Sequence, residues 1–299
     1  MALAAVSRFT GTVYTGRVSR QLLDATRYGM YAPPPMNPLS KLTTATVAAR
    51  IPYANAAPFY ALWGEAPFAV RNLAPRDLGR EAEAGTVDLG LMAAGDYLRL
   101  KERFALAGNL GLAARGAVQS VLLFSRRPAV ALSGARVSVT PETSTSIRLL
   151  RLLLDVRRGL KGVRYVRGLE PAQADALLMI GDQAMRTRSR QPEGFTQVLD
   201  LGSDWLEWTG LSFVYAVWAV RSSLEESSRQ ELREFLEASL SAGLAALPEV
   251  ARRQTEPGWS VEDMEAYLRR FHYRLGPDDL EGMRRFEELS RQHGLLETD

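Results

Sequence analysis

The sequence predicts an α/β protein built as two lobes with a ligand cleft between them. Between residues 46 and 222, short apolar segments typical of β-strands alternate with helical segments, an order that favours mostly parallel sheets. These strands are too numerous, and the long helices too few, for one compact sheet. No repeat of fixed period is visible that would indicate a solenoid, so we expect two sheets, each with its own helices.

Residues 1–45 differ in composition from the rest of the chain. They carry several arginines against a single acid, Asp24, and a run of three prolines at 33–35. Their periodicity is weak, and they lack the continuous apolar stretch of a secretory signal. We therefore expect a disordered extension at 1–45, a first lobe formed by 46–117 and 223–299, and a second lobe formed by 118–222.

The individual elements follow from apolar periodicity and from turn residues. After residue 222 the pattern predicts helix throughout. Strands are predicted at 45–53, 68–75, 87–92, 117–128, 135–140, 162–168, 174–182 and 211–221, and helices after Asn55, after Pro75, after Asp96 and at 146–158, 223–247, 260–275 and 276–296.

The composition argues against several kinds of catalysis. The chain contains no cysteine, which excludes disulfides and a cysteine nucleophile. Its two histidines, His272 on a predicted helix and His293 at a predicted helix end, are expected to be structural rather than part of a triad or metal site. Gly-rich nucleotide loops and the zinc-protease and serine-hydrolase motifs are absent from the sequence. We therefore predict an activity without cofactor or metal.

The charge pattern indicates no large polyanionic or membrane partner. The net charge is +3, but the basic residues are interleaved with acids and form no long block, so we expect no nucleic acid partner. No window approaches about 18 consecutive apolar residues, so no membrane partner is expected either.

Hydroxyl side chains gather where a strand ends and a helix begins, in the segment TPETSTS at 140–146. Free N–H groups at a helix start favour a carboxylate or phosphate, and hydroxyls add further donors. N-capping alone needs only one hydroxyl. We therefore expect capping combined with anion binding by Thr143, Ser144, Thr145 and Ser146.

Two other strand-to-helix junctions carry polar side chains. Asn55, in the segment RIPYANAAPFY, is predicted to be a helix N-cap whose amide could also hold a ligand. Asp182 follows an apolar strand, and we favour a role as cap or loop anchor over one as general base. In α/β sheets ligands collect at the carboxyl ends of strands, which favours a ligand-binding role for Asn55. The aromatic residues at 205–218 form either a hydrophobic wall between lobes or a lining for a cyclic ligand.

Taken together, these segments resemble one enzyme family. The sequences at 50–60, 87–100, 116–128, 140–154, 176–185 and 200–221 occur in the order and spacing of the chorismate dehydratases of the futalosine route to menaquinone. The resemblance covers roughly residues 46–290. Two departures are Ser212, where the family usually has proline, and Ala93-Ala94, where a serine is often found.

The resemblance implies a fold like the type 2 periplasmic binding proteins and an enzyme that removes water from chorismate to give 3-[(1-carboxyvinyl)oxy]benzoate. It implies that Asn55 and Ser120 are catalytic and that the hydroxyls at 143, 145 and 146 hold carboxylates, and Tyr53, Ser144 and Asp182 complete the predicted substrate-binding set. The base is left open between a carboxylate of the substrate and Asp182. Closure of the lobes on the ligand is expected.

Other interpretations remain open. The nearest is 1,4-dihydroxy-6-naphthoate synthase of the same pathway, although the segments at 116–128 and 209–218 fit the dehydratase better. A solute-binding protein is a different class, and the missing signal and lipid-anchor cysteine oppose it. The effector part of a transcription regulator would need a DNA-binding domain at the front, for which 1–45 is a poor candidate. We expect a cytoplasmic protein, and the sequence leaves the choice between monomer and homodimer open.

Overall fold

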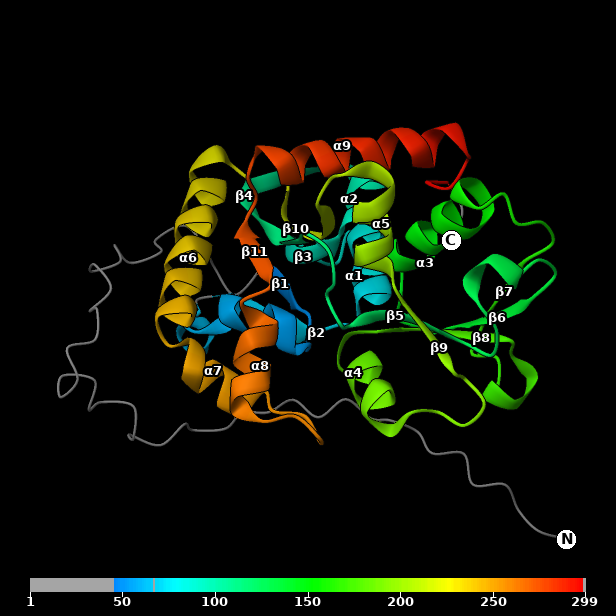
Figure 1. The fold of residues 1–299 in the computed structure, drawn as a ribbon. Helices are drawn as coiled ribbons and strands as arrows, with labels where there is room; N and C mark the ends of the chain where they lie inside the picture. Colours follow the sequence, from blue (N-terminus) through cyan, green and yellow to red (C-terminus); the bar gives the residue numbers. More distant parts are fainter. Residues whose placement is uncertain (1–45, 67, 298–299) are drawn as a thin grey trace, which may run out of the picture. The chain divides into compact units, whose positions relative to one another are not determined.

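The computed structural model describes residues 46–66 and 68–297 (Figure 1). The predicted extension at 1–45 lies outside the described residues. None of the helices within the described part is long and apolar enough to cross a bilayer.

The first sheet has six strands in the order β11-β4-β10-β3-β1-β2. Strand β1 runs parallel to β2 and β3, whereas β10 runs antiparallel to both β3 and β4, and β11 is antiparallel to β4. The strands are β1 (Val47–Arg50), β2 (Ala69–Asn72), β3 (Leu89–Ala93), β4 (Phe104–Ala114), β10 (Phe213–Arg221) and β11 (Phe271–Arg274).

The second sheet has five strands in the order β7-β6-β8-β5-β9. Strand β6 is parallel to β7 and β8, and β5 is antiparallel to β8 and β9. The strands are β5 (Val121–Ser125), β6 (Arg136–Val139), β7 (Arg164–Arg167), β8 (Ala176–Ile180) and β9 (Gln197–Asp200).

Two α/β parts are therefore confirmed, but the expectation of mostly parallel sheets is wrong, because both sheets are mixed. The antiparallel pairs arise where the chain passes from one sheet to the other and back. It leaves the first sheet after β4 and enters the second at β5, and it returns from β9 through α5 to β10. The sequence analysis put 213–221 in the second lobe, yet β10 pairs with β3 and β4 of the first sheet.

The helices begin and end at residues with clear local reasons. Helix α1 has Pro75 at its first position and ends at Gly85, whose φ of 81° is the left-handed conformation that glycine favours. Helix α8 begins with a capping box between Ser260 and Asp263. The helices are α1 (Pro75–Ala84), α2 (Ala94–Leu100), α3 (Thr145–Arg151), α4 (Gly181–Arg190), α5 (Leu201–Thr209), α6 (Glu226–Ala245), α7 (Leu247–Arg253), α8 (Val261–Leu268) and α9 (Pro277–Gln292), with the 3₁₀ turns η2 (Ala54–Tyr60), η3 (Trp63–Glu65), η4 (Ala129–Ala131) and η6 (Pro171–Gln173) and the π-helical segment η5 (Leu152–Arg157).

The prediction of continuous helix after residue 222 is wrong at β11, and His272 lies on that strand rather than on a helix. Phe271 and Tyr273 are buried, whereas His272 and Arg274 are exposed, which is the two-residue period of a half-buried strand. The strand pairs with β4, an element that the sequence analysis also did not predict.

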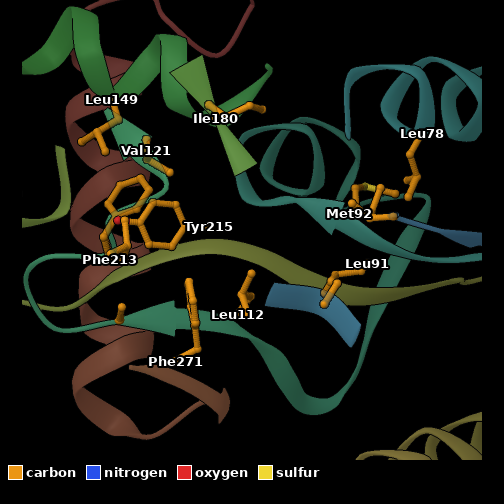
Figure 2. Close-up of a cluster of buried hydrophobic side chains, with 14 of the residues drawn as sticks. Leu78, Leu91, Met92, Leu112, Val121, Leu149, Ile180, Phe213, Tyr215 and Phe271 are labelled. Atoms are coloured by element: carbon orange, nitrogen blue, oxygen red, sulfur yellow. The ribbon is translucent and has the colours of Figure 1, made fainter. Parts of the chain in front are cut away.

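One hydrophobic core joins the two sheets. Figure 2 shows Leu112, Tyr215 and Phe271 of the first sheet near Val121 and Ile180 of the second. All of them belong to the same cluster of buried side chains. Helix α9 adds a further link, because it packs on β10 and the chain beyond it reaches α3, where the Leu295 carbonyl accepts a hydrogen bond from Arg148 Nε at 2.9 Å (Figure 1).

Candidate functional site

A pocket lies where the ends of β1, β3 and β8 and the start of β5 meet the first turns of η2 and α3. It holds about 580 Å³ of space outside the protein atoms, a volume that includes open solvent. Its lining residues are Ile51, Tyr53, Asn55, Pro75, Leu91, Ala93, Leu112, Ser120, Val121, Thr143, Ser144, Thr145, Ser146, Ile180, Gly181, Tyr215, Ala216 and Phe271.

The pocket brings together most of the residues that the sequence singled out. Asn55, Ser120, Tyr53 and the four hydroxyls at 143–146 all line it. Asp182 does not, and instead lines a neighbouring polar depression that shares Tyr53 with the pocket. None of the lining side chains is an acid, a lysine, an arginine or a histidine.

The hydroxyls at the start of α3 do not cap the helix as predicted. Ser144 is at the N-cap position, but its side chain makes no capping hydrogen bond. Its Oγ accepts instead from Arg148 Nη1 at 2.7 Å, and Thr145 Oγ1 accepts from the Gly95 N–H of α2 at 3.0 Å. Because each oxygen already accepts from a protein donor, its own proton is left to point elsewhere.

Thr143 is the most informative member of this cluster. Its side chain is fully buried, and its Oγ1 has no hydrogen-bond partner among the described residues. A buried hydroxyl without a partner is costly, so such an atom on a pocket wall indicates a place for a ligand.

Asn55 lies inside η2 rather than at its N-cap, so the capping prediction is wrong. The start of η2 is capped from the other sheet, because the Ala54 N–H donates to Asp182 Oδ1 at 3.1 Å. Helix α4 thus holds η2, and Asn55 is left with its amide on the pocket wall.

Asp182 therefore acts as an anchor between the two parts of the fold, the role that we favoured over general base. Burial raises the pKa of its carboxyl to about 6, although the hydrogen bond from Ala54 opposes the shift. Glu142 and Glu256 lie near enough to raise the pKa further.

Tyr53 closes one side of the pocket. Its hydroxyl donates to Glu142 Oε2, and burial together with this hydrogen bond raises the pKa of the phenol well above its usual range. Its ring packs on Gly181, where an added Cβ would lie 2.9 Å from the ring. Gly181 has a φ of 57°, so both the backbone and the contact require glycine there.

Ser120 sits at the end of the loop that crosses between the sheets. The loop is held by Asp200, whose Oδ2 accepts from the N–H groups of Val118 at 3.0 Å and Gln119 at 2.8 Å. Gln119 has a φ of 62°, an uncommon conformation for a residue with a side chain. The Ser120 Oγ accepts a hydrogen bond of 2.9 Å from Tyr267 Oη.

Tyr215 and Tyr267 are site residues that the sequence analysis did not assign. Tyr215 lines the pocket from β10, and its buried hydroxyl has no hydrogen-bond partner among the described residues. It was grouped with the aromatic run, most of which is core: Trp205 and Trp218 are completely buried. The alternation of Phe213, Val214 and Tyr215 in β10 is the only local signal, since it sets the tyrosine and the phenylalanine on one face.

The histidines take no part in the pocket. His272 Nδ1 lies 2.9 Å from Asp279 Oδ1, and His293 follows the end of α9. No group of three or more acidic or histidine side chains that could hold a metal ion occurs within 46–66 and 68–297.

The fold is that of the type 2 periplasmic binding proteins, a class in which two α/β parts enclose a small-molecule site. The chain is similar to a protein of Archaeoglobus fulgidus with a TM-score of 0.69 and 16% identity, covering 83% of this chain and 97% of that one. It is also similar to the periplasmic aliphatic sulphonate binding protein of Escherichia coli, with a TM-score of 0.55 and 16% identity over 85% and 94% of the two chains.

The sequence defines the family more narrowly. The profile of the menaquinone biosynthesis family matches residues 46–292, and the chain belongs to that family. It is 34% identical over 254 residues to a chorismate dehydratase of Thermus thermophilus, across 79% of this chain and 92% of the relative. A 1,4-dihydroxy-6-naphthoate synthase of the same organism is 31% identical over 169 residues, across 56% of this chain and 61% of the synthase.

Proposed function

We propose that this protein is a chorismate dehydratase. The observation that carries the proposal is a pocket with apolar walls and a cluster of buried hydroxyls, without an ionisable base in its lining. The greater coverage of the dehydratase relative, compared with the synthase relative, supports the same choice.

Chorismate carries one carboxylate on its ring and a second on its enolpyruvyl side chain, and the pocket offers matching chemistry. Leu91, Leu112, Val121 and Phe271 provide apolar contact for a ring. The Thr143 hydroxyl has no partner within the described part of the chain, and those of Ser144 and Thr145 accept from protein donors and so can donate to a carboxylate. Arg148, whose side chain is buried behind Ser144, donates to the Ser144 Oγ, and its own charge is paired with the buried Asp96 carboxylate at 3.6 Å.

In the proposed reaction a ring C–H bond breaks and its proton is taken by the enolpyruvyl carboxylate of the substrate. The electron pair forms the new ring double bond while the neighbouring C–O bond breaks and hydroxide leaves. Hydroxide and proton together make one water, so the reaction balances without oxidant, reductant or cofactor. The aromatic product supplies the driving force.

The protein residues assist by orientation and hydrogen bonding. Ser120 donates a hydrogen bond to the departing hydroxyl, and Asn55 orients the ring substituents. A hydrogen bond that strengthens as charge develops is worth ~10²–10³-fold in rate. Asp182 stays outside the chemistry, since its carboxylate is occupied by the Ala54 N–H.

The test is to incubate the purified protein with chorismate alone and to follow the products by mass spectrometry. We expect a product lighter by one water. Asn55→Ala and Ser120→Ala should each lower kcat by at least ~100-fold. Ser125→Ala is the matched control, because Ser125 ends the same strand that Ser120 precedes but its Oγ donates to the Arg127 carbonyl outside the pocket.

Unchanged chorismate from a folded protein would reject the proposal. Turnover of the naphthoate synthase substrate would then favour that enzyme, and binding without turnover would favour a solute-binding protein. We further propose a cytoplasmic location, which cell fractionation tests. The oligomeric state and lobe closure remain predictions for scattering measurements with and without chorismate.

A further inference from the structure

A tyrosine from the C-terminal part of the chain contacts the proposed catalytic residues on the side away from the pocket. Tyr267 lies on α8, next to β11 (Figure 1), and is only 1% exposed. It is not among the residues that line the pocket. Its ring is wedged edge-on between Trp259, at a centroid distance of 5.7 Å, and Phe271, at 5.2 Å. The ring therefore has little freedom to move.

The Tyr267 hydroxyl touches both proposed catalytic side chains. It donates to Ser120 Oγ at 2.9 Å, and the Asn55 side chain lies close enough to the same phenol to lower its pKa. A phenol has a single proton, so a hydrogen bond given to Ser120 leaves the Tyr267 oxygen able to accept from an amide such as that of Asn55. Tyr267 is thus hydrogen-bonded to Ser120 and lies beside Asn55.

The hydrogen bond from Tyr267 determines where the Ser120 proton can point. With one lone pair of Oγ occupied by Tyr267, the Ser120 O–H must find an acceptor of its own. Its acceptor among the described residues is the Val118 carbonyl at 3.4 Å, which is a long hydrogen bond. A ligand oxygen in the pocket would be a better acceptor than that carbonyl. Tyr267 therefore favours Ser120 as a donor toward the pocket.

The phenol is also protected from losing its proton. Burial raises the pKa of Tyr267 well above its usual range, and the nearby carboxylates of Asp182 and Asp200 act in the same direction. The hydrogen bond to Ser120 and the nearby Asn55 side chain oppose this rise without overcoming it. The group consequently stays a neutral donor, which excludes a role as the base.

We propose that Tyr267 is a positioning residue for the elimination. It fixes Ser120 as a hydrogen-bond donor to the departing hydroxyl and keeps the Asn55 amide in place beside Ser120. The inference rests on the proposed function. It explains why a helix far along the chain is packed against the crossing loop, a contact that the pocket lining alone does not reveal.

The experiment compares Tyr267→Phe with Tyr273→Phe in steady-state turnover of chorismate. Tyr273 is the matched control, since it is also buried and contacts the same Phe271, but its hydroxyl donates to the Leu268 carbonyl rather than to a pocket residue. We expect Tyr267→Phe to lower kcat at least ~10-fold with KM within ~3-fold, and Tyr273→Phe to leave both within ~2-fold.

A second readout separates positioning from general damage. In the Ser120→Ala background, Tyr267→Phe should lower kcat by no more than ~2-fold further, because residues that act as a unit are not additive. A structural role would produce the same loss in both backgrounds. Placing 4-aminophenylalanine at 267 restores a donor on the same ring and should recover much of kcat, and this variant also serves if Tyr267→Phe is too unstable to assay.

The outcomes are distinct. If wild-type protein turns over chorismate and Tyr267→Phe behaves like Tyr273→Phe, the inference is wrong and the proposed function stands. Equal activity of the phenylalanine and 4-aminophenylalanine variants would also reject it. If the wild-type protein itself fails to convert chorismate, both the proposed function and the inference about Tyr267 are wrong.

Discussion

At the scale of single residues, the hydroxyls around the pocket differ in whether they have a hydrogen-bond partner in the protein. Thr145 Oγ1 accepts from the Gly95 N–H and thereby links α3 to α2, whereas Thr143 Oγ1 has no partner among the described residues. A hydroxyl with a structural partner contributes to stability, while one without a partner lowers it unless a ligand supplies the hydrogen bond.

This contrast leads to a prediction for Thr143→Val, which replaces the hydroxyl by a methyl group of similar size. We expect the free energy of unfolding to stay the same or to rise, because an unsatisfied buried polar group is removed. The KM for chorismate should rise ~10-fold, since a hydrogen bond to a charged group is worth ~1.5–3 kcal/mol. Urea denaturation and steady-state kinetics measure the two effects.

Thr145→Val provides the control, because it also breaks the hydrogen bond from Gly95 and should lower stability by ~1 kcal/mol or more. A destabilised Thr143→Val protein with unchanged KM would contradict the assignment of Thr143 to the substrate.

The sequence predicted which residue types gather at the pocket better than it predicted their contacts. Strand ends and helix starts are local patterns, so Asn55, Ser120 and the hydroxyl segment could be located from periodicity and resemblance. The partner of each side chain comes from distant parts of the chain. Asp182 caps the turn that holds Asn55, and Tyr267 bonds to Ser120 across 147 positions, which no local pattern indicates.

At the scale of elements, the position of Asn55 depends on helix α6. Ser239 of α6 donates to the Phe59 carbonyl at 2.7 Å and accepts from the Leu62 N–H at 3.1 Å, which holds the end of η2. One turn further along α6, Gly243 packs directly on Pro58, and an added Cβ there would overlap the Pro58 carbonyl. This face of α6 therefore fixes the distance at which η2 lies.

We predict that Gly243→Ala destabilises the protein although alanine is the better helix former. Helix propensity alone would stabilise α6 by ~1 kcal/mol. Forcing a methyl group into the contact costs ~1–3 kcal/mol and must move η2, so kcat should fall as well. Gly64→Ala is the control, since an added Cβ there meets nothing within 4 Å. A Gly243→Ala protein that gains stability and keeps its activity would show that α6 and η2 are not in contact.

The elements that the sequence missed share a physical cause. Strand β11 has four residues, too few for a period of two to stand out from the helical segments on either side. Strand β10 lies in the first sheet because it follows the second crossing, and a crossing has no marker in local composition. Fold class was therefore predictable, while sheet membership at the crossings was not.

At the scale of the whole described unit, several hydrogen bonds cross between its two parts around the pocket. Among them are those that join Ala54 to Asp182, Tyr53 to Glu142, Gly95 to Thr145 and Tyr267 to Ser120. The hydrogen bond from Ala54 to Asp182 depends on pH near neutrality, because the pKa of Asp182 is raised to about 6.

The raised pKa makes a signed prediction for stability. Burial lifts the pKa of Asp182 from an ordinary 3.8 to about 6, so between these values the folded protein keeps a proton that the unfolded chain has lost. This contribution is fully present below about pH 4 and is lost as the pH rises through about 6. Asp182→Asn removes the titration but keeps an oxygen that can accept from Ala54. Relative to wild type, its free energy of unfolding should therefore rise by at least ~1 kcal/mol between pH 4 and pH 7.

Activity of the same variant identifies the base. With the substrate carboxylate as base, Asp182→Asn should keep kcat within ~3-fold, whereas loss of a general base costs ~10²–10⁴-fold. Denaturation curves at several pH values and turnover of chorismate at pH 7 give both answers from one protein. A difference in stability between variant and wild type that does not change with pH would contradict the raised pKa of Asp182. A large loss of kcat with stability retained would show that Asp182 is the general base. If Asp182 only anchors the two parts, Asp182→Asn changes the pH dependence of stability and leaves kcat nearly unchanged. If Asp182 is the base, the same substitution lowers kcat strongly. The two measurements together therefore distinguish a structural role from proton transfer.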